Sequence, residues 1–175
     1  MRMVRVYLSM TASCGAFVIC VGLGLIAGGL STRLIYPALA VGFGSGFIAM
    51  ILTAIMALRM GHRKPSLLQR LTPSICAIVE IIVLMALVPF IPADARTLFI
   101  VVLAVVGVHF LPMMVSYGPL AGGLGLACVI AAGAAWAMPA EPLAVILLVD
   151  GGLKVAFGLV ILAGLSSRHR PAALG

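Results

Sequence analysis

Four ionisable residues lie inside long apolar runs of the sequence, and their side chains are the ones that could do chemistry. They are Glu80, His109, Asp150 and Lys154. Placing such a group inside a bilayer costs about 2.5–3.5 kcal/mol on insertion scales, so such residues are functional candidates by default. Carboxyl, imidazole and amine groups can exchange protons or bind a charged solute. These four residues are therefore the predicted substrate or proton pathway.

Asp150 and Lys154 are four residues apart, so a helix would place both on one face. In a medium of low dielectric constant, each charge needs a partner or loses its charge. One interpretation is a local ion pair that lets the helix insert into lipid. The other is that one of the two residues exchanges a proton or binds a ligand.

Glu80 has no partner at helical spacing and is surrounded by isoleucine, valine and leucine. Counting about 1.5 Å per residue from Pro73 and from Ser116 places Glu80 and His109 at similar depths. The long side chain of Lys154 could also reach this depth. We therefore expect Glu80 to approach His109 or Lys154 and to take part in a proton relay. The alternative is a structural hydrogen bond.

His109 precedes a proline that leaves a backbone acceptor free. Pro112 cannot donate to the carbonyl oxygen of Val108, so a neutral His109 could bond to a backbone carbonyl instead of acting in a relay. Met113 and Met114 lie one turn further on. Histidine and methionine can hold Cu(I), but methionine commonly fills gaps between helices, so we expect no metal site.

The sequence contains none of the common motifs of soluble enzymes. The glycine-rich stretches 22–24 and 42–46 lie inside apolar runs and follow no strand, so they are not nucleotide loops. An intramembrane serine hydrolase using Ser45 or Ser116 with His109 is unsupported by any spacing. The four cysteines are expected to be reduced packing residues. We expect neither an enzyme nor a cofactor.

The composition explains why these residues must lie in a membrane. Of the 175 residues, 64% are hydrophobic and 9% are charged, with a mean hydropathy of +1.32. A soluble domain has about 25% charged residues, and one this apolar would expose large apolar patches. A disordered chain would need far more charge. The sequence predicts an integral membrane protein with a single transmembrane domain, residues 1–175.

Apolar runs of about 20 residues predict the spanning helices. An all-α bundle of six transmembrane helices is expected, although a merged or split run would give five or seven. Pro37, Pro73, Pro119 and Pro142 are expected near helix starts, where a missing N–H is tolerated. The predicted helices cover residues 7–30, 35–59, 73–92, 97–116, 118–138 and 142–165.

The arginines and lysines predict the orientation of the bundle. Only Arg33 and Arg96 fall on one side, so that side is predicted to be outside and both termini to be cytoplasmic. The formal net charge of +7 reflects contacts with anionic lipid headgroups rather than nucleic acid. The compact layout indicates the bacterial inner membrane. The opposite, cytoplasmic side receives Arg2, Arg5, Arg59, Arg63, Lys64, Arg70, Arg168 and Arg170.

Small residues recur at four-residue spacing on several predicted helices, as they do where helix backbones approach closely. They predict packing within one bundle or a homo-oligomer seam. Val79-Glu80 can be laid over Val149-Asp150, which indicates a three-plus-three repeat of inverted topology, a known transporter plan. The small residues are Gly24 and Gly28, then Ala38, Gly42 and Gly46, then Gly123, Ala127, Ala131 and Ala135.

The last predicted helix contains an Asp-x-x-x-Lys pair, Asp150 and Lys154, followed by Val155, Phe157 and Gly158. This stretch resembles the last helix of microbial rhodopsins, and the resemblance is confined to it. In that family the lysine binds retinal as a Schiff base and the aspartate is part of its counter-ion. The resemblance implies that Lys154 would hold retinal and that Asp150 would balance its charge.

The favoured hypothesis is a small transporter or channel that moves protons or a small solute. It predicts that Glu80, His109, Asp150 and Lys154 converge on one polar cavity. A non-catalytic membrane subunit or scaffold is the competing hypothesis, and it predicts local pairing only. A retinal-binding photoreceptor comes third.

Overall fold

The computed structural model describes residues 2–59, 66–91 and 94–167. These residues form six α-helices and two short 3-10 helices, with no strand among them. Each α-helix contains a stretch long and apolar enough to cross a membrane, so this part of the fold prediction is confirmed. The elements are α1 (Arg2–Leu30), η1 (Thr32–Leu34), α2 (Ile35–Arg59), α3 (Leu67–Leu87), η2 (Val88–Phe90), α4 (Ala95–Tyr117), α5 (Pro119–Ala137) and α6 (Leu143–Ser167).

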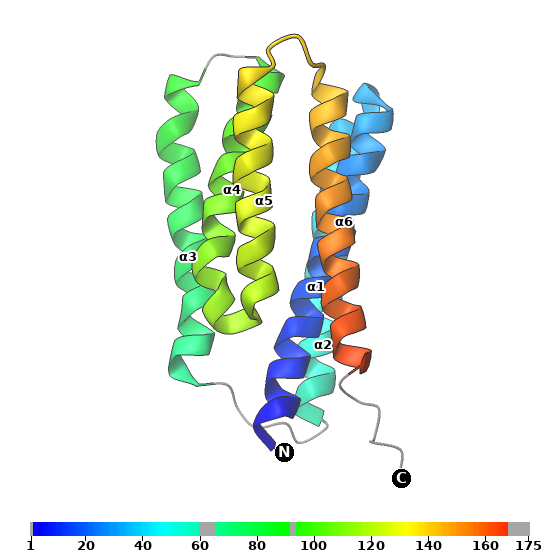
Figure 1. The fold of residues 1–175 in the computed structure, drawn as a ribbon, viewed down its shortest axis with the longest axis vertical. Helices are drawn as coiled ribbons and strands as arrows, with labels where there is room; N and C mark the ends of the chain where they lie inside the picture. Colours follow the sequence, from blue (N-terminus) through cyan, green and yellow to red (C-terminus); the bar gives the residue numbers. More distant parts are fainter. Residues whose placement is uncertain (1, 60–65, 92–93, 168–175) are drawn as a thin grey trace.

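The six helices form two groups of three (Figure 1). In the first half, α1 packs on α2 and α6; in the second half, α4 packs on α3 and α5. Fewer contacts join the halves, mainly α5 with α6 and α1 with α4. Helix α1 begins and α6 ends at the same end of the bundle (Figure 1).

Glycines set the closest approaches inside each half. A Cβ added at Gly24 of α1 would lie 3.1 Å from the Cα of Gly42 in α2, and one at Gly107 of α4 would lie 2.9 Å from the carbonyl oxygen of Gly125 in α5. No larger residue fits there without moving a backbone. At these positions the small residues pack within one bundle. A homo-oligomer seam stays a prediction.

The hairpins α1–α2 and α4–α5 are built alike. The same number of residues separates Gly24 from Gly42 as separates Gly107 from Gly125, and each pair lies on the two sides of a short connection. Along the sequence, α1 belongs to the first three helices but packs on α6, the last of the second three. Helix α4 belongs to the second three but packs on α3, the last of the first three. The inverted three-plus-three repeat stays a prediction, and the pairing of α1 with α6 and of α4 with α3 agrees with it.

The predicted start of the third helix is wrong. Helix α3 begins at Leu67, with Pro73 inside it rather than near its start. The side chain of Ser66 accepts a hydrogen bond from the N–H of Gln69, and the Gln69 side chain accepts one from the N–H of Ser66. This capping box starts the helix before the proline. Helix α4 begins at Ala95 because the Asp94 carboxylate accepts a hydrogen bond from the Thr97 N–H.

The predicted break between the fourth and fifth helices is confirmed. Helix α4 ends at Tyr117, and Gly118 follows with a φ of 93°. This is the left-handed region, which glycine adopts without a steric cost. Pro119 then begins α5, where its missing N–H costs nothing.

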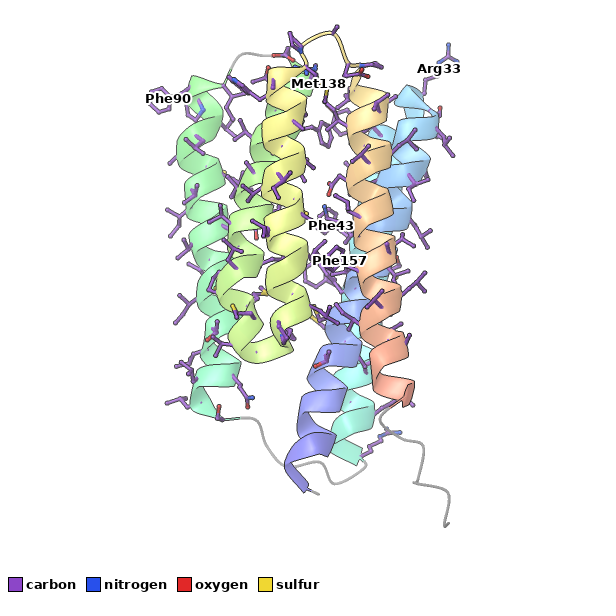
Figure 2. The ribbon with its side chains drawn as sticks, viewed as in Figure 1. Arg33, Phe43, Phe90, Met138 and Phe157 are labelled. Atoms are coloured by element: carbon purple, nitrogen blue, oxygen red, sulfur yellow. The ribbon has the colours of Figure 1, made fainter. Side chains whose placement is uncertain are left out.

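The charged ends agree with the predicted alternation of the helices. Arg33 lies at the end of the bundle opposite to the beginning of α1, together with Phe90 and Met138 (Figure 2). Arg59 lies in the last turn of α2, at the other end. The basic residues Arg63, Lys64, Arg168 and Arg170 lie outside the described residues, so the orientation stays a prediction.

The apolar core lies between the halves. It joins buried residues of α1, α4, α5 and α6, among them Val18, Leu103, Leu124 and Ile146. Helices α2 and α3 lie at the periphery and expose large apolar side chains. Such outward faces suit a hydrocarbon surrounding rather than water.

Candidate functional site

Glu80 of α3 and His109 of α4 face each other across the interface of their helices. The Glu80 Oε2 lies 2.8 Å from the His109 Nδ1. Nδ1 is enclosed but makes no aligned hydrogen bond, so this close contact is an ion pair when the imidazole is protonated. The prediction that Glu80 approaches His109 or Lys154 is confirmed for His109.

A second contact between the same helices fixes their register. Pro73 has no N–H to offer the carbonyl oxygen of Gln69 one turn earlier. The buried hydroxyl of Ser116 in α4 donates to that oxygen instead, at 3.2 Å. Because the helices run antiparallel, this bond near one end holds Glu80 opposite His109 further along.

The structure gives no support to the other interpretation of His109 at Nδ1. Among the described residues, Nδ1 makes no hydrogen bond to the carbonyl that Pro112 frees. The edge of the His109 ring contacts the ring of Phe110, with centroids 5.7 Å apart. The imidazole is therefore held by one carboxylate and one aromatic ring.

Asp150 and Lys154 form an ion pair within α6. Both residues are buried: 7% of the whole Asp150 residue and 5% of the whole Lys154 residue are exposed. The backbone of α1 comes close beside them, because an added Cβ at Gly22 would lie 2.7 Å from the carbonyl oxygen of Gly151 and 3.0 Å from the Lys154 Cβ. Part of the prediction for α6, a local ion pair on one helix face, is confirmed.

Cys128 of α5 reaches the same pair from the second half. Its Sγ lies 3.8 Å from the Asp150 Oδ1, where the thiol donates a weak hydrogen bond. Three residues after Lys154 on α6, the ring of Phe157 lies 3.3 Å from where a Cβ on Gly123 would be, between α5 and α6 (Figure 2). The Asp150–Lys154 pair therefore faces the boundary between the halves.

The structure brings the four predicted residues together as two pairs. Within the described part of the chain, no hydrogen bond or ion pair joins Glu80 or His109 to Asp150 or Lys154. The pairs lie at similar heights, because Gly125 packs beside Phe110 and Cys128 contacts Asp150 one turn along α5. A single polar cavity holding all four is not observed.

Cys128 and Ser116 are the residues that sequence reasoning missed. Nothing in the sequence places a cysteine of α5 opposite Asp150, because packing partners depend on how helices associate. Ser116 had a usable signal: a proline within a helix frees a carbonyl, and a nearby hydroxyl can fill it. The wrong start of α3 hid that signal.

The sequence model of one protein family, described as a family of unknown function (DUF6609), matches residues 3–170. The chain belongs to this family. No curated protein and no solved structure matches it. The family description assigns no activity, so function has to be argued from the geometry.

In this DUF6609 member, an arginine holds the chain that follows α5. Arg96 of α4 fastens the end of α5, donating to the carbonyl oxygens of Ala135, Met138 and Glu141 at 2.6–3.0 Å.

All four cysteines are free, and within residues 2–59, 66–91 and 94–167 no three His, Cys, Asp or Glu side chains are grouped to hold a metal. The retinal site implied by the rhodopsin resemblance stays a prediction.

Proposed function

We propose that this DUF6609 member is a multi-pass membrane protein that moves protons, alone or together with a small solute, across the bilayer. Its six long apolar helices support the membrane location. The distribution of basic residues in the sequence supports cytoplasmic termini. We place it in the bacterial inner membrane because the chain is compact and has short loops.

The Glu80–His109 contact is the observation that carries this proposal. A carboxyl and an imidazole 2.8 Å apart can exchange one proton over a hydrogen-bond distance. Imidazole gains and loses a proton near neutral pH. The side chain of Glu80 is half-buried, whereas the side chain of His109 is more enclosed, with exposed fractions of 21% and 9%. A proton held by Glu80 can therefore pass to His109, the more enclosed of the two.

The free-energy cost of placing Glu80 and His109 in a bilayer also favours a functional role for the pair. An ionisable residue in a bilayer is expensive, and two apolar residues would hold α3 to α4 at least as well. The Ser116–Gln69 hydrogen bond and the apolar contacts already join these helices. A purely structural role therefore leaves the cost of Glu80 and His109 unexplained.

Proton flux into liposomes tests the proposal. The purified protein is reconstituted with a trapped pH-sensitive dye, and a potassium diffusion potential drives protons inward. Wild type should acidify the lumen, and Glu80→Gln should slow the flux by about tenfold or more because the relay loses its titrating carboxyl.

Glu141→Gln is the matched control. It removes the same kind of carboxyl from the connection between α5 and α6, where the flux should not depend on it. Equal flux in wild type and Glu80→Gln would contradict the relay. That result would favour the competing role, a non-catalytic membrane subunit that tolerates this substitution.

A further inference from the structure

The Asp150–Lys154 pair has bonding capacity that the chain itself does not fill. An ammonium group has three N–H donors. Among the described residues, the Lys154 Nζ bonds only to the Asp150 Oδ1, which also accepts the weak bond from Cys128. Two donors of Lys154 therefore have no protein acceptor, although the residue is 5% exposed.

The position of the pair is equally informative. Two charges that only neutralised each other could lie anywhere on α6, yet these two are buried against α1 and α5, which belong to different halves. The surrounding core between the halves is apolar. Helices α1 and α5 also belong to different members of the predicted three-plus-three repeat. In transporters with inverted repeats, solute sites lie between the repeats near the middle of the membrane.

We infer that Asp150 and Lys154 form the binding site of a small zwitterionic solute, one that carries a carboxylate and an ammonium group close together. The inference rests on the proposed transport function and names its solute class. The carboxylate of the solute bonds to the free donors of Lys154, and its ammonium group bonds to Asp150.

Charge balance selects a zwitterion over a simple ion. The resting pair is neutral overall, and a zwitterion that inserts beside it keeps the site neutral. A lone anion or cation would add one net charge in a medium of low dielectric constant. The two side chains start about 6 Å apart along the helix axis, which suits a compact solute. Gly22 and Gly151 leave little space beyond it.

Counterflow in proteoliposomes tests this inference. Vesicles are loaded with an unlabelled mixture of L-amino acids and diluted into a trace of the same mixture, radiolabelled. Wild type should accumulate label transiently. Labelled methanesulfonate and labelled tetramethylammonium, which carry one permanent charge each and have no neutral form that crosses lipid, should not accumulate in vesicles loaded with their unlabelled forms.

Two variants separate binding from folding. The double variant Asp150→Asn with Lys154→Met contains no buried charge, so it should fold yet lose counterflow by about tenfold or more. Gly152→Ala is the matched control on the same helix, because an added Cβ there meets nothing within 4 Å. It should keep the counterflow of wild type.

Proton flux measured in the same vesicles keeps the two proposals apart. Wild-type proton flux without amino-acid counterflow overturns the solute site and leaves the relay standing. The absence of both overturns both. Accumulation of methanesulfonate or tetramethylammonium as strong as that of amino acids, or full counterflow in the double variant, also overturns the zwitterion site.

Discussion

Glu80 and Asp150 are the acidic residues of α3 and α6, the helices that occupy equivalent places in the two halves. Asp150 pairs with Lys154 on its own helix, beside the close contact of Gly22 and Gly151. Glu80 pairs with His109 on the neighbouring helix, and 21% of its side chain is exposed, against 9% for Asp150. The pair within one helix suits the holding of a solute, and the pair that joins two helices suits proton exchange between its two partners.

The largest difference between the pairs should appear when one charge is removed. Lys154→Met leaves Asp150 buried without its charged partner and with only the weak bond from Cys128, and breaking a buried pair in this way costs about 3–5 kcal/mol of unfolding free energy. Adding Asp150→Asn should recover most of the lost unfolding free energy. Thermal unfolding in detergent measures both variants. Equal stability of the single and double variants would show that Asp150 is not enclosed as described.

The glycine contacts of the two halves should respond alike. A Cβ at Gly151 would lie 2.6 Å from the carbonyl oxygen of Gly22, and one at Gly125 would lie 2.6 Å from that of Gly107. Each glycine-to-alanine change should cost about 1–3 kcal/mol, as overpacking does. The controls Gly152→Ala and Gly133→Ala meet nothing within 4 Å and should be neutral. A control as unstable as Gly151→Ala would contradict this packing.

Glu80→Gln should have a smaller effect on stability. An amide can still bond to the imidazole and leaves no charge inside the bilayer, so about 1 kcal/mol or less is expected. The same thermal unfolding assay measures it. A loss as large as that of Lys154→Met would mean that Glu80 holds α3 in place rather than exchanging protons.

The smallest effect should come from the cap of α4, and it should depend on pH. Hydrogen bonds from the Thr97 side chain and backbone lower the pKa of Asp94. A carboxyl whose pKa is lowered by folding stabilises the folded state above its unfolded pKa and loses that effect as pH falls through the lowered value. Asp94→Ala should therefore lower the melting temperature slightly at neutral pH and less in acid. A difference that grows in acid would contradict this cap.

The fold was largely predictable because apolar runs of spanning length leave few alternatives to helices. The start of α3 was not, since the capping box of Ser66 and Gln69 outweighs the helix-ending tendency of Pro73. Depth counting from the helix ends placed Glu80 level with His109. Depth alone cannot say which helices are neighbours. The prediction therefore placed all four residues in one cavity, whereas the structure holds them as two pairs.

The central claim is that Glu80 and His109 act as one proton-handling unit. Proton flux in liposomes should be measured for wild type, Glu80→Gln, His109→Gln and the double variant. If the pair is one relay, each single variant loses most of the flux and the double variant loses no more than the worse single one. Losses that multiply in the double variant, or single variants that conduct like wild type, would contradict the account.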